Sequence, residues 1–317
     1  MNSKFFPDAK QPETLAPKLV THKLVLVGGG EVTSEIQGAF VHLARCAPAG
    51  DRGSSAPVLL VCGLASSDPH RSLQKSKTLF QNHPGSEYAI RVEPLDFLTP
   101  DELAPHGESW VPCLAQMAQK KASHSDVLSK LKEAQGVFFL GGDQNRILDS
   151  LVGTEFHQLL LERWRKGQIV VGGTSAGLQV CSQWALSGQF KNPELEQNPE
   201  EIKCSVIRKN HVELKPGFGF LENTILDQHF VVRQRQNRLF SALLDKKECV
   251  GIGVDEATAL CTWRVPGDKN NTAVAQVVGD SQVFVARCLK EKSPMEFKVE
   301  IYGSGDFLPQ DHLFLNL

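Results

Sequence analysis

Ser175 lies in the stretch VVGGTSAGLQV, between glycines and other small residues. The apolar run 168–171 predicts a strand, and the helical spacing of apolar residues in 178–186 predicts a helix directly after the turn. A serine on such an elbow exposes its hydroxyl, and the N–H of Ala176 at the start of the helix can face a developing oxyanion. The pattern Gly-x-Ser-x-Gly therefore predicts a nucleophile, with a plain helix N-cap as the alternative.

A catalytic serine needs a base, and His229 is the histidine whose surroundings suit that role. It ends the apolar run NTILDQHF, where a parallel sheet presents functional side chains, whereas the other nine histidines lie mostly in polar or helical surroundings. Arg233, Arg235 and Arg238 follow within nine residues. They predict either a solvated basic helix face or a cluster that binds carboxylates beside the active site.

Two glycine-rich turns follow other predicted strands. In GVFFLGGDQNR, Gly141 and Gly142 end a strand and residues 143–145 open a helix, so backbone N–H groups can approach a ligand or an oxyanion. A tight turn with an N-cap is the alternative. In VGGGEV the dinucleotide-binding pattern G-x-G-x-x-G would require glycine at position 33, which is Thr33. The sequence therefore argues against a nucleotide-binding turn there.

Short apolar runs alternate with helical segments up to the serine, at residues 23–29, 56–64, 88–95, 136–142 and 168–173. This order predicts an α/β fold with a mostly parallel sheet flanked by helices. A long polar loop is predicted at 188–201, and strand-like runs follow at 224–230, 249–263, 272–279, 281–290 and 296–303. We therefore expect an irregular leader over 1–20 and a single α/β domain over 21–317 whose C-terminal third is β-rich, as an antiparallel extension or a second small sheet.

Composition restricts the class of protein. The chain has 317 residues, and 34 Lys and Arg against 36 Asp and Glu leave a net charge of −2 without a long run of either sign. This balance predicts no binding to nucleic acid or to an anionic membrane surface. No apolar run has the length of a signal peptide or a membrane span, and the eight cysteines lack metal-ligand spacing. We expect buried free thiols, no metal and a cytoplasmic protein.

Five motifs occur in order between about Lys23 and Leu260: VGGGE, FFLGGDQ, GGTSAG, PGFGFLENTILDQHFVVRQRQNRL and GIGVDEATAL. Together they resemble the cyanophycinase family of serine peptidases, which also contains aspartyl dipeptidase. The resemblance implies an α/β fold like that of class I glutamine amidotransferases and a serine nucleophile on an elbow. It also implies the absence of a metal or organic cofactor, and a homodimer.

The resemblance further implies roles for single residues. Ser175 is the expected nucleophile and His229 the base, and the N–H groups of Ala176 and Gly142 are the expected oxyanion donors. The candidate substrate-binding residues are Gln144, Asp227, Gln228, Arg233, Arg235 and Arg238.

The acid member of the triad is expected in the segment SGQFKNPELEQNPEEIK, where Glu194 is preferred and the alternates are Glu196, Glu200 and Glu201. Asp255 and Glu256 of GVDEATAL are expected to end a strand rather than to line the rim of the site.

The implied activity is exopeptidase cleavage of cyanophycin, a polyaspartate whose side-chain carboxyls carry arginine. Ser175 would attack the β-aspartyl main-chain carbonyl, and hydrolysis of the acyl-enzyme would release β-aspartyl-arginine dipeptides. One alternative is a dipeptidase for aspartyl or isoaspartyl dipeptides. Another is a catalytically silent binding or sensor protein, against which the intact Ser175, His229 and GGDQ motif argue.

Overall fold

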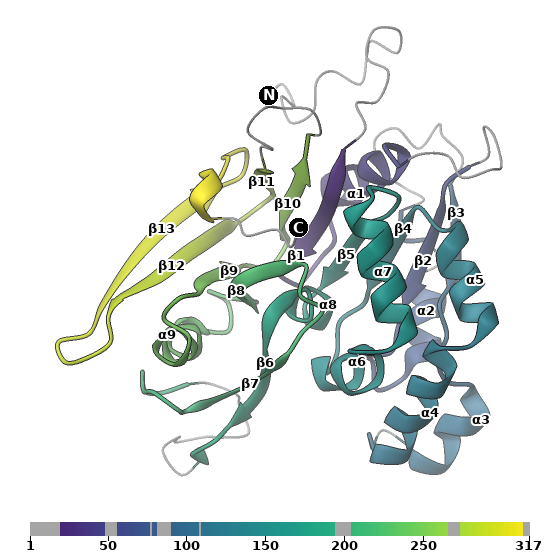
Figure 1. The fold of residues 1–317 in the computed structure, drawn as a ribbon, viewed down its shortest axis with the longest axis horizontal. Coiled ribbons are helices and arrows are strands. Elements are labelled where there is room, and N and C mark those ends of the chain that lie inside the picture. Colours follow the sequence, from purple (N-terminus) through teal and green to yellow (C-terminus); the bar gives the residue numbers. More distant parts are fainter. Residues whose placement is uncertain are drawn as a thin grey trace, which may run out of the picture.

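The chain forms two β-sheets that lie side by side, with helices packed on both faces of the first sheet (Figure 1). The computed structural model describes residues 20–47, 56–76, 78–80, 90–107, 109–193, 204–265 and 273–312. None of the helices within these ranges is both long and apolar enough to cross a membrane.

The first sheet has seven strands in the order β11-β10-β1-β5-β4-β2-β3. The five central and right-hand strands are parallel, which confirms the strands predicted before Ser175: β1 Thr21–Val27, β2 Val58–Cys62, β3 Arg91–Pro94, β4 Gly136–Phe139 and β5 Val170–Thr174. Strands β10 (Thr258–Arg264) and β11 (Ala273–Gly279) extend the sheet in antiparallel orientation. Because the carboxyl ends of the parallel strands share one edge, the loops that follow them lie close together.

Helices cover both faces of this sheet. On one face α1 (Ser34–Arg45) and α2 (Pro69–Ser76) pack with residues such as Val25 and Leu59. The opposite face packs against α4 Pro112–Ala122, α5 Ser125–Glu133, α6 Gln144–Leu151 and α7 Glu155–Arg165. Two short turns, α3 Pro100–Leu103 and the 3-10 helix η1 Ala104–His106, precede α4. Burial of the strands on both faces explains why their sequences are continuously apolar.

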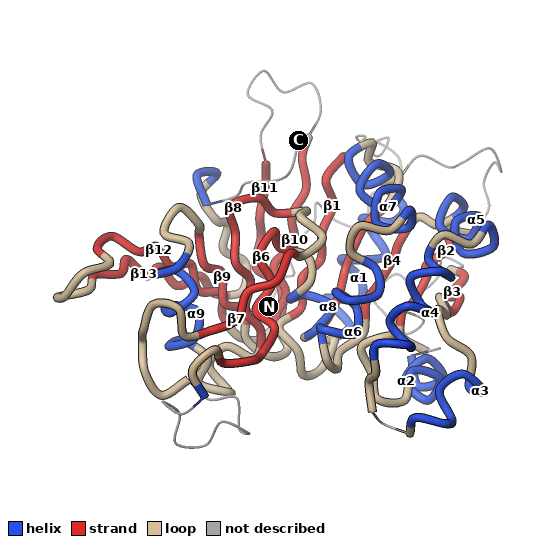
Figure 2. The backbone as a smooth tube through the Cα atoms, turned by 60° about the horizontal axis from the view of Figure 1, so that its bottom comes forward, coloured by secondary structure: helices blue, strands red, loops and turns tan. Residues whose placement is uncertain are grey.

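The second sheet has six strands in the order β13-β12-β9-β8-β6-β7. Their bounds are β6 Ser182–Phe190, β7 Val212–Pro216, β8 Leu221–Gln228, β9 Val250–Val254, β12 Gln282–Lys290 and β13 Glu296–Gly303. Helix α9 (Gln236–Asp245) packs on it, and the 3-10 helix η4 (Gln310–His312) follows β13. Figures 1 and 2 both place this sheet beside β1 and β10, with the β12–β13 hairpin projecting away from the rest of the chain. The β-rich C-terminal third is therefore divided between two sheets.

The helix predicted over 178–186 is wrong for most of its length. Helix α8 covers only Ala176–Gln179, and Ser182 begins strand β6. Trp184 and Ala185 pair with both β7 and β8, so a partner strand on each side overrides the local helical spacing. The polar loop predicted from residue 188 begins later, because β6 continues to Phe190, and residues 194–203 lie outside the described ranges.

Lys23 is a buried cation in β1, with a fully buried side chain. Its Nζ donates to the carbonyl oxygen of Gly167 at 3.0 Å, and burial lowers its pKa to about 8. Between that value and the ordinary value of 10.5 the unfolded chain binds more protons at this site. Lys23 therefore costs stability at pH 7, and the cost falls as the pH rises through this window.

We expect Lys23→Met to raise the free energy of unfolding at pH 7 by about 1–2 kcal/mol. Removing the charge gains up to about 3 kcal/mol, and the lost hydrogen bond offsets part of that gain. Urea unfolding of both proteins at pH 7 and near pH 10 measures the effect. The stability difference should shrink at the higher pH, and a variant less stable than wild type at pH 7 would contradict this account.

Candidate active site

Ser175 stands at the sharp turn between β5 and α8. Its φ and ψ are 54° and −110°, a left-handed conformation that is strained for serine. Its N–H donates to the carbonyl oxygen of Val27 at 3.0 Å, so the turn is tied to the end of β1. The side chain forms no capping hydrogen bond to α8. The N-cap alternative therefore does not hold, and the hydroxyl is free to face the site.

The glycines on either side of the serine are required by close packing. A Cβ on Gly173 would lie 2.4 Å from the carbonyl carbon of Gly177. A Cβ on Gly177 would lie 2.2 Å from the carbonyl oxygen of Phe139, the last residue of β4. Only glycine fits at both positions, so the Gly-x-Ser-x-Gly spacing reflects how closely β4, β5 and α8 approach one another.

His229 brings an imidazole to the serine from the other sheet. It directly follows β8, has a left-handed φ of 48°, and donates its N–H to the carbonyl oxygen of Gly28 at 2.7 Å. Its Nε2 lies 2.9 Å from the Oγ of Ser175. A Cβ on Gly29 would lie 2.1 Å from the Cε1 of His229. The VGGGE turn thus leaves room for the histidine ring, a role the sequence did not indicate.

Glu256 completes a chain of hydrogen bonds through His229. Its carboxylate contacts the Nδ1 of His229, the ring nitrogen opposite the one that faces the serine. Glu256 lies in the turn between β9 and β10 and is partly exposed. A carboxylate on Nδ1 selects the tautomer whose Nε2 can accept the serine proton.

The preferred acid, Glu194, and its three alternates lie outside the described residues. The expectation that Glu256 only ends a strand is wrong, because its carboxylate reaches the histidine. The signal in the sequence was an acidic residue directly after a buried strand, which is common enough to be missed.

Asp255 holds the segment that follows His229. Its carboxylate, 5% exposed, accepts hydrogen bonds from the N–H of Val231 at 3.1 Å and of Val232 at 3.2 Å. It also accepts one from the Oγ of Ser281 at 3.1 Å. Adjacent carboxylates therefore have separate tasks: Asp255 fixes the backbone beside the histidine, and Glu256 contacts its ring.

The surroundings of His229 favour its neutral form. Burial lowers the pKa of His229, the positive charges of Arg233 and Arg235 lower it further, and the hydrogen bond that His229 donates to Glu256 opposes both. A neutral imidazole at pH 7 can accept a proton, which is what a general base requires.

The GGDQ turn lies against the serine from the side of β4. A Cβ on Gly141 would lie 3.3 Å from the Cβ of Ser175, so this glycine packs directly against the serine. Gln144, expected to bind substrate, is instead 93% buried, and its Nε2 donates to the carbonyl oxygens of Leu186 at 3.1 Å and Ser187 at 2.6 Å. Its amide nitrogen therefore joins α6 to β6, which corrects the expectation for that group.

Asp227 and Arg238 are also not placed for contact with substrate. They form a buried ion pair in which the Nε of Arg238 donates to Oδ2 of Asp227 at 2.8 Å and Nη2 donates to Oδ1. The exposed fractions of the two residues are 0% and 2%. The guanidinium of Arg238 binds both carboxylate oxygens of Asp227, so the pair joins α9 to β8 and neither side chain is accessible to solvent. The sequence could not distinguish this arrangement from a substrate clamp.

The remaining three candidates, Gln228, Arg233 and Arg235, lie close to Ser175 or His229. Gln228 is buried, and its Oε1 lies 3.2 Å from the Oγ of Ser175, the hydroxyl that also faces the Nε2 of His229. Arg235 is buried and donates from Nη1 to the carbonyl oxygen of Gln228 at 3.0 Å, and burial together with the charge of Arg238 lowers its pKa to about 9. Arg233 is exposed. Of the three arginines, Arg233 is therefore the one that solvent can reach directly.

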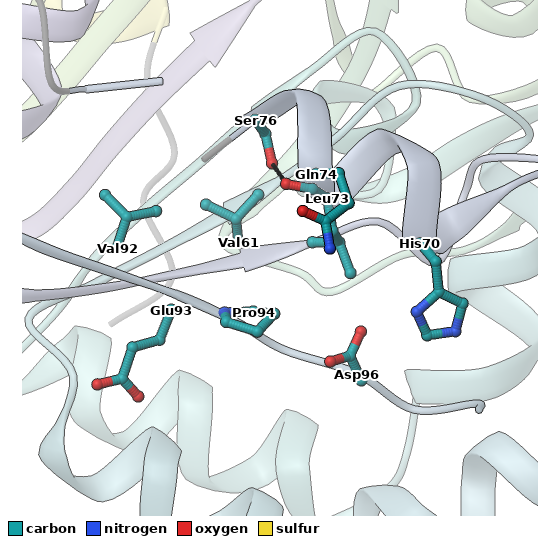
Figure 3. Close-up of a pocket in the computed structure, with 9 residues that line it drawn as sticks. All are labelled: Val61, His70, Leu73, Gln74, Ser76, Val92, Glu93, Pro94 and Asp96. Atoms are coloured by element: carbon teal, nitrogen blue, oxygen red, sulfur yellow. Dashed lines mark hydrogen bonds between the residues drawn. The ribbon is translucent and has the colours of Figure 1, made fainter. Parts of the chain in front are cut away.

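A cavity of about 310 Å³ lies elsewhere, between α2 and the strands β2 and β3 (Figure 3). Its apolar lining comes from Val61, Leu73, Val92 and Pro94, and its polar lining includes His70 and Asp96. None of the residues around Ser175 contributes to it. It is therefore a feature separate from the serine site.

Comparison with known proteins agrees with this geometry. Residues 111–266 match the sequence model of peptidase family S51. A cyanophycinase from Trichormus variabilis is 32% identical over 140 residues, which cover 44% of this chain and 43% of that protein. One from Geminocystis herdmanii is 29% identical over 163 residues, covering 48% and 56%. The chain thus aligns with about half the length of these curated relatives.

The crystal structure of a peptidase from an acI-B1 actinobacterium has the same fold. It superposes with a TM-score of 0.59 at 21% identity, covering 92% of this chain and 98% of that one. The matched region 111–266 contains Ser175, His229 and Glu256. Residues 111–266 are thus similar to peptidase family S51, and about half of the chain is similar to cyanophycinases.

Proposed function

We propose that this chain is a serine peptidase that cleaves the main-chain linkages between the aspartyl units of cyanophycin and releases β-aspartyl-arginine dipeptides. The observation that carries the proposal is the hydrogen-bonded chain from Ser175 Oγ through His229 to Glu256. A structural serine has no need of a base and an acid aligned in this way. The cyanophycinases that match the chain support the choice of substrate.

The proposed reaction proceeds through an acyl-enzyme. His229 takes the proton of Ser175 on Nε2 while Oγ attacks the main-chain carbonyl carbon of an aspartyl unit that carries arginine, and the protonated imidazole is stabilised by Glu256. The C–N bond then breaks as His229 gives that proton to the leaving amine. Water attacks the ester, His229 takes a proton from it, and the carboxylic product leaves as the proton returns to Oγ.

The groups for the oxyanion and the substrate follow from their places around Ser175. We propose the N–H of Ala176, at the start of α8, and that of Gly142 as oxyanion donors. Gln228 and Arg235 lie beside the proposed base, His229. Arg233, which is exposed to solvent, is proposed to bind a carboxylate of the substrate. The homodimer implied by the resemblance and the cytoplasmic location expected from the sequence stay predictions.

Release of dipeptide from insoluble arginine-aspartate polymer tests the function directly. Wild type is expected to release β-aspartyl-arginine, identified by mass, while Ser175→Ala releases none because no ester can form. Absence of product from wild type would overturn the polymer as substrate. Hydrolysis of free isoaspartyl dipeptides by the same protein would then indicate the dipeptidase.

Glu256→Gln tests the acid of the triad against Glu194→Gln as the matched control. Loss of the Glu256 charge should lower kcat about 10²- to 10⁴-fold, since the imidazolium loses its stabilising partner. It should also lower the pKa of His229, because Glu256 raises it. The acid limb of the profile of kcat/KM against pH should therefore move to lower pH. A loss of activity in Glu194→Gln, with little change in Glu256→Gln, would reverse the assignment.

Arg233 and Arg238 should differ in what their removal changes. Arg233→Ala should raise KM about tenfold for a substrate with a free carboxylate and leave stability unchanged, because the side chain is exposed. Arg238→Met should lower the free energy of unfolding by about 3–5 kcal/mol, because it leaves Asp227 charged and buried. Kinetics and urea unfolding of both variants separate the two roles. Equal effects of the two substitutions on KM alone would contradict them.

A further inference from the structure

We propose that Arg146 is a positioning residue that holds the Gly141–Gly142 turn in place beside Ser175. The inference rests on the proposed function, because it assigns a support to the proposed oxyanion turn. Arg146 lies in the first turn of α6 and is 7% exposed. It was not among the residues that the sequence singled out.

The turn is held between two neighbours. On one side Gly141 lies against the Cβ of Ser175, as described above. On the other side Gly142 adopts φ +141°, and a Cβ there would lie 2.0 Å from the carbonyl oxygen of Ala65. The N–H of Asp143 donates to that same oxygen at 2.8 Å. The position of the turn relative to the serine therefore depends on the loop that contains Ala65.

This loop, residues 63–68, is internally ordered. The N–H of Ser66 donates to the carbonyl oxygen of Gly63 at 2.9 Å, and the Oγ of Ser72 in α2 donates to the Oγ of Ser66 at 2.7 Å. The loop directly follows β2 and so begins at the same sheet edge as the serine turn. It provides a fixed surface for the glycine turn.

Arg146 connects the helix after the turn to the loop under the turn. Its Nη1 donates to the carbonyl oxygen of Ser66 at 2.7 Å. Its guanidinium carbon lies 5.3 Å from the ring centroid of Trp110, which precedes α4. The hydrogen bonds from Asp143 to Ala65 and from Arg146 to Ser66 thus form a closed ring of contacts, in which the glycine turn, helix α6 and the loop 63–68 are each joined to the next. Hydrogen bonds with a charged donor are among the stronger hydrogen bonds in proteins, and this one is partly buried.

Loosening this ring should affect the transition state more than substrate binding. An oxyanion donor acts only when its N–H points at the position the charged oxygen will occupy, and errors near 1 Å cost about a hundredfold. The neutral carbonyl oxygen of the bound substrate accepts a weaker hydrogen bond from the same N–H, so its binding depends less on the position of the donor. Arg146→Met should therefore lower kcat about 10- to 100-fold and change KM less than about twofold.

Arg163→Met is the matched control. Arg163, in α7, is also buried, at 9% exposure, and donates from Nη1 to a backbone carbonyl, that of Leu131. It shares no contact with the glycine turn among those described. We expect its removal to leave kcat within about twofold of wild type. Arg146→Lys, which keeps one charged donor, should recover part of the lost kcat and serves if the methionine variant fails to fold.

Kinetics on a soluble β-aspartyl-arginine oligomer and hydrogen–deuterium exchange of residues 140–145 measure the two parts of the proposal. Exchange at the Asp143 amide should rise at least tenfold in Arg146→Met and stay at the wild-type rate in Arg163→Met. An equal fall of kcat in both variants, or unchanged exchange and kcat in Arg146→Met, would overturn the inference. An inactive wild type would instead count against the proposed function, and the exchange rates would still decide whether Arg146 holds the turn.

Discussion

The hydrogen-bonded chain through His229 requires three strand ends from two sheets to meet within a few ångströms. Ser175 follows β5 of the first sheet, His229 follows β8 of the second, and Glu256 lies in the turn where the chain passes from the second sheet to the first. The sheets must therefore be joined accurately at this edge. Several residues with positive φ lie where the two sheets meet, among them Ser175, His229 and Gly29.

The junction depends on left-handed residues and glycines. Ser175 and His229 both have positive φ, and each donates its N–H to the end of β1, to Val27 and Gly28 respectively. Gly29 then admits the histidine ring. Strained conformations of this kind persist only where their surroundings determine them fully. The end of β1 thus fixes the positions of both Ser175 and His229.

Buried polar groups also fix the segments on either side of His229. The Asp227–Arg238 pair secures β8 to α9, and Asp255 collects the N–H groups that follow His229. Each of these groups would be costly to bury alone, and each has its partner within the described residues. The arginines that follow His229 therefore differ in role: Arg238 supports the structure and Arg233 is exposed, although they are only five positions apart.

The sequence alone determined the elements whose signals are local. The five parallel strands follow from continuous apolar runs, and the serine elbow follows from glycines that only close packing would require. His229 could be chosen among ten histidines because it ends a buried run. The family resemblance pointed to the same serine and histidine.

Tertiary structure decided what depends on distant partners. Residues 182–190 carry helical spacing in part, yet strands on both sides make them β6. Glu256 follows a strand as many acidic residues do, and only the junction of the sheets brings it to the Nδ1 of His229. Whether an arginine binds a buried carboxylate or faces solvent is likewise set by packing around α9. Periodicity reports the surroundings of a residue along its own element, whereas these roles come from contacts between elements far apart in the chain.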